Sequence, residues 1–141
     1  MDMEKLQPLI GHWDLTMIMS TDPPLELTGW ATFEWLEGGR FIIQRWDVNH
    51  PQAPGGIAIL GPGEAEGEFV QHYFDGRGVQ REYTLRLDDG VVSLCRDAPG
   101  FSQRFTGTFS TDGTVIDGCW EKCEDGLTWV HDFDLLYTAR H

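Results

Sequence analysis

Turn-forming dipeptides recur along the whole chain at short intervals, which leaves little room for helices. Asp-Gly and Gly-Gly pairs stand at 38–39, 55–56, 75–76, 89–90, 112–113, 117–118 and 125–126. Both pairs tolerate the positive φ angles that tight hairpin turns require. Between them lie short segments rich in aromatic and β-branched residues, which favour strands. The chain is therefore predicted to be all-β, with consecutive strands joined by hairpins.

Ten strands and one short helix are predicted. The strands cover residues 11–20, 25–36, 40–49, 56–61, 67–74, 78–87, 90–96, 101–110, 113–122 and 127–139. The helix candidate runs from Asp2 to Leu9 and ends before Gly11. Ten strands in one small domain either leave exposed sheet edges or close into a barrel, and closure removes the edges. We therefore predict that residues 1–141 form one domain, a single antiparallel up-and-down barrel with a short N-terminal helix.

Acidic residues outnumber basic ones, with 23 Asp and Glu against 10 Lys and Arg and a formal net charge of −13. Nucleic acids and anionic membranes attract basic surfaces, so neither is an expected partner. No apolar run approaches the roughly 18 residues of a membrane span, and the start lacks the apolar stretch of a signal peptide. The three cysteines cannot all pair with one another, so a reducing, cytoplasmic setting is expected.

Period-two alternation predicts which side chains face the interior of the barrel, because a slip of one residue would turn the whole apolar set outward. The predicted polar lining consists of Arg81, Tyr83, Gln103, His131 and Tyr137. The predicted apolar wall consists of Phe33, Trp46, Phe105 and Phe133. His72 lies on a strand of ambiguous facing, and it joins the lining if its face points inward.

Small residues stand beside aromatic ones on these inward faces, as Gly29 and Ala31 do beside Phe33. A barrel of ten strands also encloses room for a small ligand. A buried Arg81 must meet an acidic side chain, ordered water or an anionic group of a ligand. We therefore expect a small, largely apolar or aromatic ligand with an anionic or carbonyl group, and no cofactor. The competing interpretation pairs Arg81 internally with one of four carboxylates: Asp47, Asp97, Asp117 or Glu121.

A second hypothesis assigns the same cavity to a cofactor-independent enzyme, such as an isomerase, a cyclase or a lyase. His131 or His72 would move a proton, and Arg81 or Tyr83 would stabilise the developing oxyanion. The unperturbed pKa of an imidazole, near 6.5, suits such a proton transfer. Carrier and enzyme both remain open at this point.

Cys119 and Cys123 have a spacing that superficially resembles half of a metal site. Residues four apart on a strand lie about 13 Å from each other, so one ion cannot bridge them. No second ligand pair has the usual spacing, and no metal site is predicted. Trp30 faces outward on its strand, either as a contact in a homodimer or as a single exposed aromatic residue.

Short motifs stand at the two ends of the predicted barrel. Gly11-His12-Trp13 opens the first strand, and Arg140 follows the last. This arrangement resembles lipocalins and fatty-acid-binding proteins, and the resemblance implies that Trp13 packs under Arg140 and plugs the barrel floor. Longer segments resemble a group of uncharacterised bacterial lipocalin-like barrel proteins over nearly the whole chain, namely those at 33–41, 72–78, 101–110, 118–122 and 129–135. The likeness implies the barrel and no particular activity.

Two other members of the superfamily suggest polar contacts in the interior. Fatty-acid-binding barrels hold a carboxylate with an Arg-x-Tyr motif, and Arg81-Glu82-Tyr83 has this spacing on one strand. Nitrobindin-like barrels carry haem on a single axial histidine in the final strand, a position that His131 matches. The second resemblance implies haem binding through His131 as a further alternative.

Overall fold

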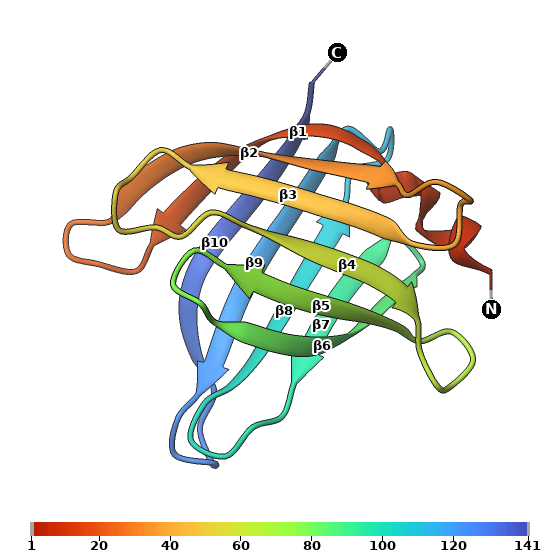
Figure 1. The fold of residues 1–141 in the computed structure, drawn as a ribbon. Helices are drawn as coiled ribbons and strands as arrows, with labels where there is room; N and C mark the ends of the chain where they lie inside the picture. The colour runs from red at the N-terminus through yellow and green to blue at the C-terminus, as the bar shows by residue number, and fades with distance from the viewer. Residues whose placement is uncertain (1, 141) are drawn as a thin grey trace.

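The computed structural model describes residues 2–140, which form a closed antiparallel barrel of ten strands (Figure 1). Each strand pairs with its neighbours in sequence, and β1 pairs with β10 to close the ring. The strands are β1 (Gly11–Met19), β2 (Leu25–Trp35), β3 (Ile42–Val48), β4 (Gly56–Pro62), β5 (Phe69–Asp75), β6 (Gln80–Asp88), β7 (Val91–Arg96), β8 (Ser102–Phe109), β9 (Val115–Cys123) and β10 (Val130–Ala139). The predicted all-β, up-and-down barrel is confirmed.

A 3₁₀-helix, η1 (Met3–Leu9), precedes β1 and covers one end of the barrel. Lys5 ties it to the end of β6 through an ion pair of 3.0 Å with Asp88, the last residue of that strand. The predicted helix therefore exists in the tighter 3₁₀ form, which is common for short helical segments. No helix among residues 2–140 is long and apolar enough to cross a bilayer. Three apolar side chains of η1 are buried in the core: Met3, Leu6 and Leu9.

The indole of Trp13 packs at this closed end against η1 rather than under Arg140. Its Nε1 donates to the carbonyl oxygen of Leu9 at 2.9 Å. Because Trp13 pairs with Ala139 across β1 and β10, the next residue, Arg140, lies on the outer face. There its guanidinium forms an ion pair with Asp14. The predicted stack of Trp13 under Arg140 is therefore wrong, although Trp13 does help to close the barrel floor.

Glycines on inward faces make room for close packing. A Cβ on Gly118 would lie 2.3 Å from a ring carbon of Phe105, and one on Gly29 would lie 2.2 Å from the backbone oxygen of Asp47. Both distances are far below van der Waals contact, so these positions accommodate a neighbouring ring or strand. At these two positions the glycine therefore serves close packing and does not by itself create open space. The cavity lies at the end away from η1.

Candidate functional site

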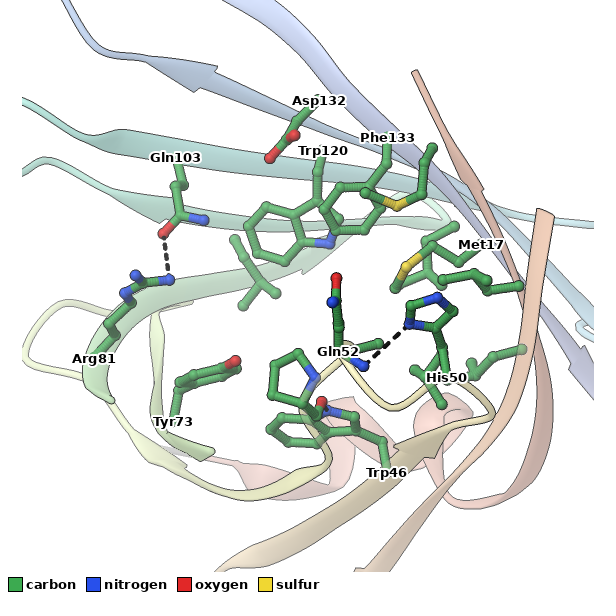
Figure 2. A pocket seen from close by; sticks show the side chains of 18 of the residues that line it. Met17, Trp46, His50, Gln52, Tyr73, Arg81, Gln103, Trp120, Asp132 and Phe133 are labelled. Atoms are coloured by element: carbon green, nitrogen blue, oxygen red, sulfur yellow. Dashed lines mark hydrogen bonds between the residues drawn. The ribbon is translucent and has the colours of Figure 1, made fainter. Parts of the chain in front are cut away.

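The interior opens into a cavity of about 530 Å³ near the loops at the end opposite η1 (Figure 2). In an up-and-down barrel the loops after β1, β3, β5, β7 and β9 share that end. The volume lies within the range of ordinary small-molecule pockets. The rim of the cavity is formed by residues in or next to these loops: Thr21, His50, Gln52, Arg77, Phe101 and Asp132.

Aromatic rings form two walls of the cavity. Trp46 on β3 stacks on Tyr73 of β5, with ring centres 5.2 Å apart and planes inclined by 28°. Trp120 on β9 stacks in the same way on Phe133 of β10, at 6.3 Å and 30°. The Nε1 of Trp46 donates to the backbone oxygen of Pro54, which holds the β3–β4 loop against the rim. The predicted inward facing of Trp46 and Phe133 is therefore confirmed.

Arg81 on β6 lines the cavity, and its hydrogen-bond partner is neutral. Its Nη1 donates to Oε1 of Gln103 at 3.4 Å, and its guanidinium carbon lies 5.3 Å from the centre of the Phe101 ring. Within residues 2–140, no carboxylate oxygen lies within the 4.0 Å of an ion pair with Arg81. The competing interpretation, an internal salt bridge of Arg81, is therefore wrong for all four carboxylates named as examples: Asp47, Asp97, Asp117 and Glu121.

Tyr83 and Gln103 are buried beside Arg81, as their predicted inward facing requires. The Tyr83 hydroxyl donates to Oε1 of Gln103 at 2.8 Å, so this amide oxygen accepts from both neighbours. Burial raises the pKa of Tyr83, and the phenol therefore stays a protonated donor at neutral pH. The Arg81–Gln103–Tyr83 cluster presents a positive, donor-rich surface to the cavity.

The second cation of the cavity, Arg77, is neutralised by Asp75. Nη2 of Arg77 lies 2.7 Å from Oδ2 of Asp75, whose side chain has no exposed area. The Tyr73 hydroxyl donates to the same oxygen at 2.7 Å. The Arg77 guanidinium holds the pKa of Asp75 well below its usual range, while burial raises the pKa of Tyr73. Asp75 therefore stays ionised, and Arg81 is the cation of the cavity that has no anionic partner among residues 2–140.

Tyr137 places a hydroxyl near the floor of the cavity. Its ring packs on Trp13 and Phe33, and among the described residues no group forms a hydrogen bond with its oxygen. Burial raises the pKa of this phenol, so it stays protonated. By contrast, the buried side chains of Gln71 and Gln44 on the wall form a hydrogen bond with each other, in which Nε2 of Gln71 donates to Oε1 of Gln44 at 2.8 Å. Tyr137 therefore offers a second polar contact to a ligand, deeper than Arg81.

His131 does not face the cavity, so the predicted facing is wrong. The pairing of β10 with β9 shifts between His131 and Phe133, which leaves Asp132 as an extra, unpaired residue. This β-bulge reverses the alternation, so Asp132 lines the cavity while His131 lies exposed on the outer wall. Neither the predicted proton transfer in the cavity nor an axial bond to a haem held there fits an outward imidazole.

Three other predicted lining residues also lie outside the cavity wall. His72 on β5 is exposed and pairs across the outer face with Glu82 of β6, so the inward alternative is wrong. Phe33 and Phe105 do face inward, at 5% and 4% exposure, but they belong to the packed core beneath the cavity. They support Tyr137 from below instead of lining the cavity.

Residues that the sequence interpretation did not single out complete the rim. Arg77 follows an Asp-Gly turn, which identifies a hairpin but does not determine where its side chain points. His50 and Gln52 lie in the β3–β4 loop, where the backbone N–H of Gln52 donates to Nδ1 of His50 at 3.1 Å. Asp132 lines the cavity only because of the β-bulge, and no residue pattern in the sequence predicted that bulge.

No protein-family model and no curated protein sequence matches the chain. Several solved structures share its architecture, among them the following two. The crystal structure of Rv2717c from M. tuberculosis is similar with a TM-score of 0.74 and 12% identity, over 98% of this chain and 96% of that chain. The S-type phycobiliprotein lyase CPES from Guillardia theta is similar with a TM-score of 0.68 and 12% identity, over 100% and 93%. At such identity the likeness shows the fold alone, a closed, lipocalin-like β-barrel.

Proposed function

We propose that the protein binds a small, largely aromatic molecule carrying a carboxylate or another anionic group in the barrel cavity. The observation that carries the proposal is the position of Arg81, a cation at the cavity wall with only a neutral hydrogen-bond partner. A partly buried guanidinium gains most from a charged acceptor, because charge-assisted hydrogen bonds are about twice as strong as neutral ones. Stacked rings on two walls suit a flat apolar body.

The polar groups of the cavity lie at different depths and therefore contact different parts of the ligand. Arg81 receives the anionic group, since the other cation, Arg77, is already paired with Asp75. Tyr137 donates to an acceptor at the inner end of the ligand. Asp132 at the rim disfavours a second anionic group there, so the ligand is expected to carry its negative charge on the Arg81 side.

Binding without catalysis is the better supported alternative. The enzyme hypothesis relied on an imidazole in the cavity, and both His131 and His72 lie on the outer face. His50 reaches the rim, but its Nδ1 already accepts a hydrogen bond from the backbone N–H of Gln52. The phenols that line the cavity, Tyr73, Tyr83 and Tyr137, have raised pKa values and serve as donors rather than bases.

Two fluorescent probes with a similar aromatic body test the proposal. Anilinonaphthalene sulfonate carries an anionic group, and N-phenylnaphthylamine lacks it. Replacing Arg81 by Met removes the guanidinium and keeps an unbranched apolar stem. A hydrogen bond to a charged group contributes about 1.5–3 kcal/mol, so Arg81→Met should weaken the anionic probe at least about tenfold. Binding of the neutral probe should stay within about twofold.

Arg86→Met is the matched control, because Arg86 lies on the same strand but pairs with Glu68 on the outer face. It should leave both dissociation constants unchanged. Leu27 lines the cavity, so the larger side chain of Leu27→Trp should fill part of it and weaken the binding of both probes. Failure of the wild-type protein to bind either probe, or an equal loss in Arg81→Met and Arg86→Met, would refute the proposal.

Native mass spectrometry of the protein as purified would identify a ligand that co-purifies. Because one similar barrel is a phycobiliprotein lyase, a bilin with its carboxylates belongs in the ligand panel.

We also propose that the chain belongs to the group of bacterial lipocalin-like barrel proteins and that it is located in the cytoplasm. The three unpaired thiols, on Cys95, Cys119 and Cys123, agree with a reducing compartment.

A further inference from the structure

We propose that Cys119, His131 and Asp134 form a binding site for a divalent cation of the zinc class on the outer wall of the barrel, across β9 and β10. This site is separate from the cavity. One ligand atom of each residue lies within 4.8 Å of the other two. The sequence prediction of no metal site considered Cys119 together with Cys123, whereas the fold brings Cys119 to two different partners.

The register of two strands brings these side chains together. Cys119 and Asp134 are direct cross-strand partners, so both point to the outer face. On a regular strand, His131 and Asp134 would face opposite sides, because they are three residues apart. The β-bulge at Asp132 turns His131 outward and places all three ligand types on one face. Thus the irregularity that removes His131 from the cavity also builds the cluster.

The distances require only small side-chain movements to hold a metal ion. Zinc bonds of about 2.0–2.3 Å in a tetrahedral site separate the ligand atoms by about 3.3–3.6 Å. The Nε2 of His131 lies 2.8 Å from Oδ1 of Asp134, slightly closer than this, and the Cys119 sulfur must approach from within 4.8 Å. Rotation of exposed side chains on a fixed pair of strands can supply both changes.

Ser20 provides the outer partner that metal-binding histidines commonly have. Its Oγ forms a hydrogen bond of 2.5 Å with Nδ1 of His131. As the side chains stand, Nε2–H of His131 donates to the Asp134 carboxylate. When a metal ion replaces that proton and Nδ1–H donates to the serine, the lone pair of Nε2 is directed toward the ion. Such a partner fixes the tautomer and the orientation of the ring.

The local charge also favours a cation. Among residues 2–140, no lysine or arginine pairs with Asp134, whose ionic partner is His131. Burial and the nearby carboxylates, with Asp134 the strongest of them, raise the pKa of the Cys119 thiol, so the metal ion must displace a proton when it binds. A thiolate, an imidazole and a carboxylate form a mixed donor set that suits zinc and cobalt better than magnesium or calcium.

Cobalt(II) is the probe of choice, because a bond to a thiolate gives a charge-transfer band that a carboxylate or imidazole site lacks. Wild-type protein is expected to bind one equivalent with this band, and zinc should displace it. Cys119→Ser should abolish the band. His131→Ala and Asp134→Asn should each weaken cobalt binding at least about tenfold. Near-ultraviolet circular dichroism checks that each variant keeps the barrel.

Cys95→Ser and His72→Ala are matched controls, since both residues are exposed on other strands of the same outer surface. They should leave the band and the affinity unchanged. The proposal is overturned if wild-type protein gives no thiolate band, or if Cys95→Ser removes the band. It is also overturned if His131→Ala and Asp134→Asn both bind cobalt as tightly as the wild type.

Discussion

Replacing Asp75 by Asn should destabilise the barrel while leaving its shape almost unchanged. Oδ2 of Asp75 accepts hydrogen bonds from the Tyr73 hydroxyl at 2.7 Å and from Nη2 and Nε of Arg77 at 2.7 and 3.2 Å. Oδ1 accepts from the backbone nitrogens of Arg77 and Val79. Asparagine keeps one carbonyl oxygen for the backbone donors but presents an NH₂ group to the other three.

The expected loss follows from these contacts. Breaking a fully buried ion pair by removing one partner costs about 3–5 kcal/mol. Arg77 is half exposed, with 55% of its side chain accessible, so water can replace part of its lost interaction. We therefore expect a loss of about 2–3 kcal/mol in the free energy of unfolding. With an m-value of about 2 kcal/mol/M in urea, the midpoint of unfolding should fall by about 1–1.5 M.

The acid dependence of stability provides a second readout for the same carboxylate. Arg77 and Tyr73 hold the pKa of Asp75 below its value in the unfolded chain, which is about 3.9. The ionised group therefore stabilises the fold fully above pH 5 and loses this contribution as the pH falls through the unfolded and then the folded pKa. Below about pH 4, the stability of Asp75→Asn should decline less steeply than that of the wild type.

Asp112→Asn is the control for this prediction. Asp112 also accepts several hydrogen bonds, from Ser110 and Thr114, but it lies in an exposed turn between β8 and β9. Its change in urea midpoint should be clearly smaller. Equal midpoints for wild type and Asp75→Asn at pH 7, with an unchanged m-value, would refute the reasoning that the buried carboxylate organises this corner of the cavity.

Two further predictions concern packing, measured by urea unfolding. Gly118→Ala should lower the free energy of unfolding by about 1–3 kcal/mol, because the new Cβ would lie 2.3 Å from the Phe105 ring. Gly76→Ala is the control and should cost far less, because its Cβ would meet the nearest atom at 3.6 Å. An unchanged stability of Gly118→Ala would contradict the tight contact. Phe69→Ala should cost about 3–5 kcal/mol because this ring is 0% exposed. Phe74→Ala on the same strand, at 39% exposure, should cost much less, and similar losses for both would refute the assignment of the core.

Local patterns in the sequence were sufficient for the architecture. Turn dipeptides marked most boundaries between strands, although Asp117-Gly118 lies within β9. Alternation correctly placed Arg81, Tyr83 and Gln103 on the inner face. Both features depend on residues within one hairpin, where φ preferences and period-two exposure act without reference to the rest of the chain. For the same reason, the inward aromatic walls around Trp46 and Phe133 were predictable.

The sequence could not determine which partners meet across the barrel. The lack of a carboxylate beside Arg81 depends on the register of β6 against its neighbours and on the fold of the rim loops. The ion pair between Asp75 and Arg77 was likewise not predictable, since Arg77 lies in a turn, where alternation does not specify the direction of a side chain. Only the assembled structure identifies Arg81 as the arginine of the cavity that has no anionic partner among residues 2–140.

The sequence by itself determined a ten-stranded all-β chain and the inner face of most strands, because turn chemistry and alternation are local. The tertiary structure determined on which side of the barrel wall the His131 side chain lies. One extra residue in β10, Asp132, turned this imidazole out of the cavity and set it beside Cys119 and Asp134. A bulge depends on how two strands pair along their whole length, so its consequences follow from the closed barrel and not from the residues that form it.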